Sequence, residues 1–146
     1  MKGKRILILS LILVMAIAGF TVASAGFGTT DSKIFTVAGT SFENWSSVYT
    51  TSTTARATSS IQTYNYNTLP MGHMGAQARL YHVGTTAAIS DTGMEWTKAA
   101  ARGITASTPT LNVSPGYYYS QGTTQVYNGS NYTSEPTYRT PNVYTN

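Results

Sequence analysis

The sequence predicts an all-β protein, built as a single small β-sandwich or open barrel of about six to eight short antiparallel strands. Three observations support this fold class. Thr and Tyr, which suit a pleated sheet, are abundant after residue 25, whereas the helix formers Leu, Glu and Lys are scarce. Short extended runs alternate with Gly, Pro and Asn turn signals. The eleven tyrosines, two tryptophans and low charge distinguish the chain from a disordered one.

The first 25 residues have the pattern of a secretory signal peptide. A basic start precedes an almost unbroken apolar run over residues 6–15, and Ala23-Ser24-Ala25 is typical of a cleavage site. A retained N-terminal membrane anchor is the alternative interpretation, although the run is short for a span of roughly 20 residues. We therefore expect a secreted protein, with membrane contact only through this segment before cleavage.

Charge and cysteine content exclude several function classes. The formal net charge of the chain is +4, but three basic residues belong to the signal segment, namely Lys2, Lys4 and Arg5. The remainder carries six basic and five acidic residues, and its basic residues are scattered singly, so we expect no nucleic-acid partner. The absence of cysteine excludes disulfides, thiol catalysis and cysteine-ligated metals.

The first half of the exported part divides into short extended segments. Residues 26–32 are small and polar apart from Phe27, which is typical of a flexible N-terminus, and the β domain is expected to span residues 33–134. Its first strands are indicated by β-branched and aromatic residues. In chain order, we expect strands at 33–37 and 42–49, an exposed Thr/Ser-rich ribbon or long loop at 50–60, and a strand at 59–67.

Residues 75–83 have the clearest strand pattern, after a break at 68–72 caused by Pro70 and Gly72. Alternate residues of a strand face opposite sides, so the pattern predicts one apolar face and one polar face. The residues expected on the first face are Ala76, Ala78, Leu80 and His82, and those on the second are Gln77, Arg79, Tyr81 and Val83. A turn at 84–86 then leads into a short strand at 87–90.

Residues 91–103 fit two structures. Asp91 would cap a helix and Gly103 would end it, after an alanine triplet. The same residues also alternate as in a strand. We favour the strand because Thr92 and Gly93 would weaken a first helical turn.

The C-terminal third predicts further strands separated by turns. Asn128-Gly129 is the strongest two-residue hairpin signal in the chain. Pro136 and Pro141 indicate a C-terminal tail over residues 135–146, which lies along the domain or extends from it. The expected strands are 104–113, 117–120, 123–127 and 131–133.

Motifs that carry chemistry are few. Asp91-Thr92-Gly93 matches the triplet of aspartic proteases, but a turn held by the Asp side chain explains the same residues. His73 and His82 are the only histidines; His73 with Met71 and Met74 fits either a copper site or a loop whose side chains only fill space, and we favour the loop. No nucleophile elbow occurs. We therefore expect no enzymatic activity, no cofactor and no metal.

The tyrosines of the C-terminal third are the best functional signal. Tyr offers a rigid surface that is both apolar and polar, and such residues are enriched in binding sites. Cross-strand tyrosine pairs that cover a polar sheet face are the structural alternative. The candidate binding residues are Tyr117, Tyr119, Tyr127 and Tyr132.

The leading hypothesis for function is a secreted, non-enzymatic β domain that binds a cell surface, a glycan, the cell wall or another extracellular protein. In size, export and cysteine-free, β-rich character, the chain is also similar to small bacteriocins of Gram-positive bacteria. That resemblance implies a secreted antimicrobial or toxin-like polypeptide of a Gram-positive bacterium as the alternative, and it assigns a role to no residue.

Overall fold

The computed structural model describes residues 25–146, so the expected signal segment at residues 1–25 lies outside the described residues except for Ala25. The described part is all-β, with fourteen strands and no helix. No helix that could span a membrane occurs in this range. The all-β antiparallel class is confirmed, whereas the number of strands exceeds the expected six to eight.

Most of the strands are short. In chain order they are β1 (Gly26–Thr29), β2 (Lys33–Val37), β3 (Thr40–Thr50), β4 (Thr54–Thr63), β5 (Met74–Gln77), β6 (Arg79–His82), β7 (Ser90–Asp91), β8 (Glu95–Trp96), β9 (Gly103–Ser107), β10 (Leu111–Asn112), β11 (Gly116–Ser120), β12 (Thr123–Tyr127), β13 (Tyr132–Pro136) and β14 (Val143–Thr145).

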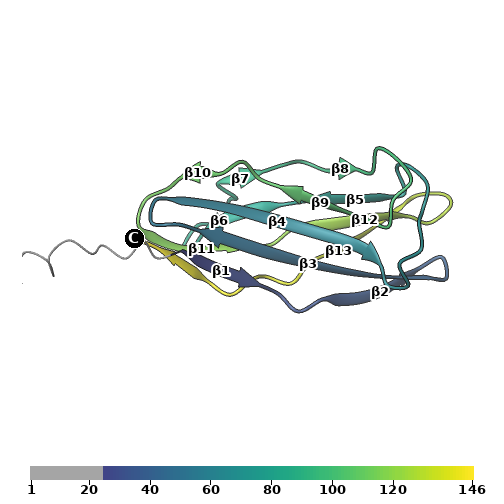
Figure 1. The fold of residues 1–146 in the computed structure, drawn as a ribbon, viewed down its shortest axis with the longest axis horizontal. Helices are drawn as coiled ribbons and strands as arrows, with labels where there is room; N and C mark the ends of the chain where they lie inside the picture. Colours follow the sequence, from purple (N-terminus) through teal and green to yellow (C-terminus); the bar gives the residue numbers. More distant parts are fainter. Residues whose placement is uncertain (1–24) are drawn as a thin grey trace, which may run out of the picture.

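Three antiparallel sheets make up the fold (Figure 1). The six-stranded sheet is centred on β3 and β4; β1 and β2 pair with successive parts of β3, and β9 and β10 pair with successive parts of β4. The other two sheets have the strand orders β14-β11-β6-β7 and β13-β12-β5-β8. Four segments of the chain each contribute one strand to both four-stranded sheets. These segments are β5–β6, β7–β8, β11–β12 and β13–β14.

Breaks within these four segments account for part of the excess of strands. Ala78 separates β5 from β6, and its amide donates to Thr92 Oγ1 at 3.1 Å. Gly122 lies in the break between β11 and β12, where its amide donates to Thr137 Oγ1 at 2.9 Å. At both breaks the backbone amide donates to a threonine hydroxyl and not to the carbonyl of a neighbouring strand. The buried amides therefore keep a hydrogen-bond partner.

The core consists of two apolar clusters between the six-stranded sheet and the four-stranded sheets. In the first, Phe42 and Ile61 of the six-stranded sheet share a buried cluster with Met74 and Val126. The second includes Val48, Ala55, Ala57, Leu80 and Tyr118. Burial of these side chains supplies the main favourable term in folding.

A layer of buried hydroxyl groups separates the two clusters. Along β3 the buried residues of the inward face run from Phe42 through Asn44 and Ser46 to Val48. The Ser46 hydroxyl contacts the hydroxyls of Ser59 at 2.9 Å and Thr137 at 2.6 Å. We call Ser46, Ser59 and Thr137 the hydroxyl layer. The Thr137 hydroxyl also accepts a hydrogen bond from the Gly122 amide, so the hydroxyl layer supplies a partner for the backbone at the break between β11 and β12.

The segment expected to be a flexible N-terminus contains a strand instead. β1 pairs with β3 from Gly26 opposite Thr50 to Thr29 opposite Ser47. A Cβ on Gly28 would lie 2.9 Å from the side chain of Val143, and one on Gly26 would collide with it. Glycine therefore allows β1 to lie directly against β14, a long-range contact that the local sequence does not reveal.

The expected C-terminal tail is also part of the fold. β13 continues to Pro136 and pairs with β12, and β14 pairs with β11. Thr140 and Thr145 are buried. The Thr140 hydroxyl accepts the amide of Ser120 at 2.9 Å, which fixes the link between the two strands.

The alternation predicted within residues 75–83 is confirmed for its central residues. Ala76, Ala78 and Leu80 are buried, and the intervening residues are partly exposed. The stretch 50–60, by contrast, is not a long loop. β4 begins at Thr54, and its Ala residues face the core.

Residues 91–103 form neither a helix nor one continuous strand. Only the two-residue strands β7 and β8 and the start of β9 occur there. Gly93 has a φ of 67°, which turns the chain between β7 and β8. The helical interpretation is wrong, and the strand interpretation holds only in part.

Candidate functional site

The four candidate tyrosines all lie on the outer faces of the two four-stranded sheets. Tyr117 and Tyr119 flank the buried Tyr118 on β11, so both point away from the core. Tyr127 on β12 and Tyr132 on β13 are opposite each other in the register. The structure does not bring the four together but divides them between two aromatic clusters.

The first group, which we call the tyrosine cluster, consists of Tyr81, Tyr117, Tyr119 and Tyr144. Tyr119 and Tyr81 are cross-strand partners whose rings stack with centroids 4.9 Å apart and planes 6° apart. Tyr117 and Tyr144 are also partners, with centroids 5.0 Å apart. The guanidinium of Arg139 lies 3.8 Å from the Tyr119 ring centroid, within cation–π range.

The second group, the tryptophan cluster, consists of His73, Trp96, Tyr127 and Tyr132. The Trp96 and Tyr132 rings have centroids 4.3 Å apart, and Tyr127 lies 5.4 Å from both Tyr132 and His73. Trp96 can lie over the sheet because its partner is Gly75. A Cβ on Gly75 would lie 2.8 Å from the indole ring.

A hollow of about 580 Å³ adjoins the tryptophan cluster. Its apolar lining includes Met71, Met94 and Trp96, and its polar lining includes Glu95 and Lys98. Met71 is well exposed. The combination of apolar walls with a few polar groups is typical of a ligand site.

A polar network lies between the two clusters. Gly75, Gln77, Arg79 and Tyr81 follow one another at every second position along β5 and β6, so the network continues the same outer face. The Asp91 carboxylate accepts hydrogen bonds from two side chains. Gln77 Nε2 donates to Oδ1 at 2.7 Å and to Oδ2 at 3.0 Å, and Arg79 Nε donates to Oδ2 at 3.0 Å. Arg79 also donates to Gln77 Oε1 at 2.6 Å, which holds all three side chains in place.

Hydrogen bonds in this network keep Asp91 ionised. Burial raises the pKa of Asp91, but hydrogen bonds from Gln77, from the Gly93 amide and from Arg79, together with the charge of Arg79, outweigh it. The net effect holds the pKa below its ordinary value of 3.8. The Gly93 amide donates to Asp91 Oδ1 at 2.7 Å, which is the turn that accounts for the Asp-Thr-Gly triplet.

The Asp91→Asn variant is expected to make protein stability less dependent on acidic pH. Because the folded-state pKa is depressed, Asp91 contributes stability above its unfolded-state pKa, and this contribution is lost as the pH falls through the folded-state value. Urea unfolding between about pH 5 and pH 2 should show a shallower loss of unfolding free energy in the variant. Asp31→Asn, outside the network, is the control, and equal slopes for wild type and Asp91→Asn would contradict the prediction.

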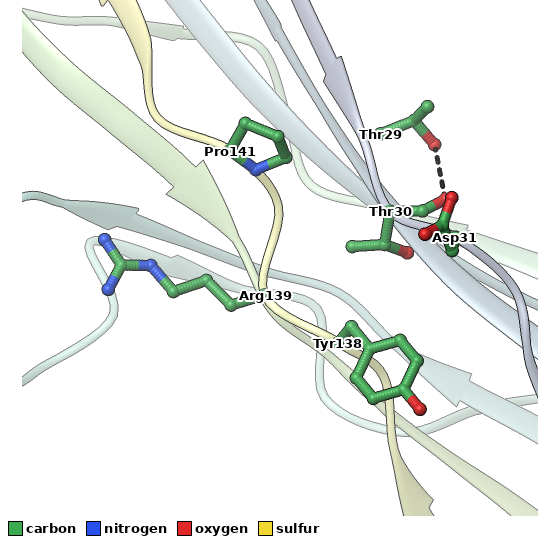
Figure 2. Close-up of a pocket in the computed structure, with 6 residues that line it drawn as sticks. All are labelled: Thr29, Thr30, Asp31, Tyr138, Arg139 and Pro141. Atoms are coloured by element: carbon green, nitrogen blue, oxygen red, sulfur yellow. Dashed lines mark hydrogen bonds between the residues drawn. The ribbon is translucent and has the colours of Figure 1, made fainter.

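A separate hollow of about 390 Å³ lies between the link from β1 to β2 and the link from β13 to β14 (Figure 2). Its lining includes Asp31, Tyr138 and Arg139. Figure 2 shows that the Arg139 side chain extends away from the other two. Its guanidinium lies over Tyr119 instead. The charges of this hollow do not converge, so it is a weaker candidate than the aromatic face.

The histidines lie in different aromatic contacts. His73 meets the edge of Tyr127, and His82 meets Tyr118 with centroids 5.1 Å apart. Within residues 25–146, no group of three His, Cys, Asp or Glu side chains is placed to hold a metal ion. Both histidines thus have a structural explanation in aromatic packing.

Sequence reasoning missed half of the aromatic face. Besides the four candidate tyrosines, the two clusters contain His73, Tyr81, Trp96 and Tyr144, and the network around Arg79 lies between the clusters. One signal was present in the alternation of residues 75–83, which placed Arg79 and Tyr81 on the same polar face. Trp96 had no such signal, because its segment fitted a helix as well as a strand.

No protein-family model, curated protein or solved structure matches the chain.

Proposed function

We propose that the protein is a secreted, non-enzymatic extracellular domain that binds a cell-surface or cell-wall glycan. The observation that carries this proposal is the outer face of the four-stranded sheets, where a tyrosine cluster and a tryptophan cluster flank a hydrogen-bonded polar network. The layered packing of the sheets favours a sandwich over an open barrel. The basic and apolar N-terminal pattern supports export.

The chemistry of this face suits sugars. A pyranose ring offers an apolar face of C–H groups and a rim of hydroxyls, so it needs flat rings beside fixed donors and acceptors. Tyr117 and Tyr132 expose about half of their surfaces, 53% and 46%, on the two clusters. Gln77, Arg79 and Asp91 are already oriented by one another, which reduces the entropy lost when a ligand binds.

Alanine substitution of the tyrosine cluster tests the proposal. Purified exported protein should be retained by Gram-positive cell wall or by members of a glycan array, and Tyr117→Ala with Tyr119→Ala should reduce retention about tenfold or more. Phe27→Ala is a matched control, because Phe27 is 59% exposed but lies on the six-stranded sheet.

Three results would count against glycan binding. These are no retention on any polymer, retention unchanged in the double variant, or capture only of a protein from the cell surface. Killing of susceptible cells by the purified protein would instead favour the alternative, an antimicrobial polypeptide.

A further inference from the structure

An amine, an amide and a carboxylate converge near one end of the core. Lys33 on β2 and Asn44 on β3 are directly opposite in the antiparallel register, and both side chains are on the inward face. Lys33 Nζ lies 2.7 Å from Glu135 Oε2 on β13, in the facing sheet. Side chains of such cross-strand partners begin with Cβ atoms about 4.5–5.5 Å apart, so the lysine can reach the asparagine Cγ.

Asn44 is fully buried and only partly satisfied. Its Nδ2 donates to Thr124 Oγ1 at 2.7 Å and to the main-chain oxygen of Glu135 at 3.3 Å. Its Oδ1 has no hydrogen-bond partner, the only such buried side-chain atom in residues 25–146. An unpaired buried carbonyl is costly, so a functional explanation is warranted.

We propose that Lys33 and Asn44 become joined by an intramolecular amide bond, with Glu135 carrying the proton. The Lys33 ammonium passes a proton to the Glu135 carboxylate, which leaves a neutral amine as the nucleophile. The amine attacks Asn44 Cγ, the new Nζ–Cγ bond forms and the Cγ–Nδ2 bond breaks. Protons from Glu135 and from the attacking amine join the two hydrogens of Nδ2, which leaves as an ammonium ion. The Glu135 carboxylate is restored, the neutral mass of the chain falls by one ammonia, and the reaction needs no oxidant.

The surroundings favour this reaction in three ways. Thr124 and the Glu135 main chain hold the asparagine amide in place. Phe35 and Phe42, the next pair on the same inward face of these two strands, stack beside the site and limit water on that side. The Lys33 and Glu135 side chains are 27% and 28% exposed, which leaves a route for ammonia to escape.

Intact mass and a tryptic map of the purified exported chain test the proposal. We expect a mass lower by one ammonia than the sequence requires. Trypsin should fail to cleave after the acylated Lys33, so the chain from the mature N-terminus to Arg56 should appear as one peptide that also lacks one ammonia. Complete cleavage at Lys33 together with the full mass would overturn the proposal, whether or not any variant folds.

Matched variants identify the bonded atoms. Lys33→Arg keeps a positive charge but should restore the full mass, as should Asn44→Ala and Glu135→Gln, whereas Lys98→Arg should retain the loss. A loss of water instead of ammonia would assign the bond to Glu135 and overturn the proposal. So would an ammonia loss that persists in Lys33→Arg or that maps to the peptide containing Asn128-Gly129.

Discussion

Gly122→Ala is expected to reduce the free energy of unfolding by about 3 kcal/mol, a large part of the stability of a small domain. A Cβ at this position would collide with Ser59 Oγ and with the main-chain oxygen of Gln77. The second of these atoms belongs to the backbone and cannot rotate away. The substitution would also disturb the amide that donates to Thr137 at 2.9 Å.

Thermal and urea unfolding measure this effect. The midpoint temperature of thermal unfolding should fall by about 10 °C. Gln121→Ala is the control, because it changes the neighbouring residue of the same break without placing an atom in the hydroxyl layer. In a Ser59→Gly background, Gly122→Ala should cost less but still destabilise, since the collision with Gln77 remains. An unchanged midpoint in Gly122→Ala would contradict close packing of Gly122 against Ser59 and Gln77.

Trp96→Ala is expected to weaken binding to the retained glycan or cell wall about thirtyfold, equivalent to about 2 kcal/mol. The indole lies on Gly75, contacts Tyr132 and lines the 580 Å³ hollow, so its loss removes a wall of the hollow and the support of a neighbouring ring. Trp96→Phe should restore part of the affinity, because a smaller ring still covers Gly75.

Sedimentation with insoluble cell wall measures this affinity, and fluorescence offers a second readout. The chain has two tryptophans, so Trp96 can be observed alone in a Trp45→Phe background. Phe27→Ala again controls for the loss of an exposed aromatic side chain. Equal binding by Trp96→Ala and wild type, with both folded by circular dichroism, would exclude the tryptophan cluster from the site.

The fold class and several elements were predictable because they depend on local patterns. The alternation in residues 75–83 places Ala76, Ala78 and Leu80 in the core. The hairpin signal at 128–129 predicted the position of the turn between β12 and β13, but that turn spans residues 128–131 and not two residues. Strands β1 and β14 were missed because their stability comes from distant partners. Nothing near Gly28 in the sequence indicates that Val143 lies against it.

The candidate site was predictable in kind but not in arrangement. That Tyr117 and Tyr119 would share a face follows from their spacing on one strand. Which rings they meet depends on the register of β11 against β6 and β14, and register is set by long-range pairing. Asn44 and Glu135 belong to facing sheets, so their proximity has no trace in the sequence.

The hydroxyl layer has a consequence for how unique the folded state is. A core lined entirely with apolar side chains tolerates a shift of one sheet over the other by two residues, because similar groups meet again after the shift. Here such a slip would move Ser46 and Thr137 out of contact and leave their hydroxyls among hydrocarbon groups. The hydroxyl layer therefore favours the observed alignment of the two sheets over alignments shifted along the strands, because only the observed one pairs these hydroxyls.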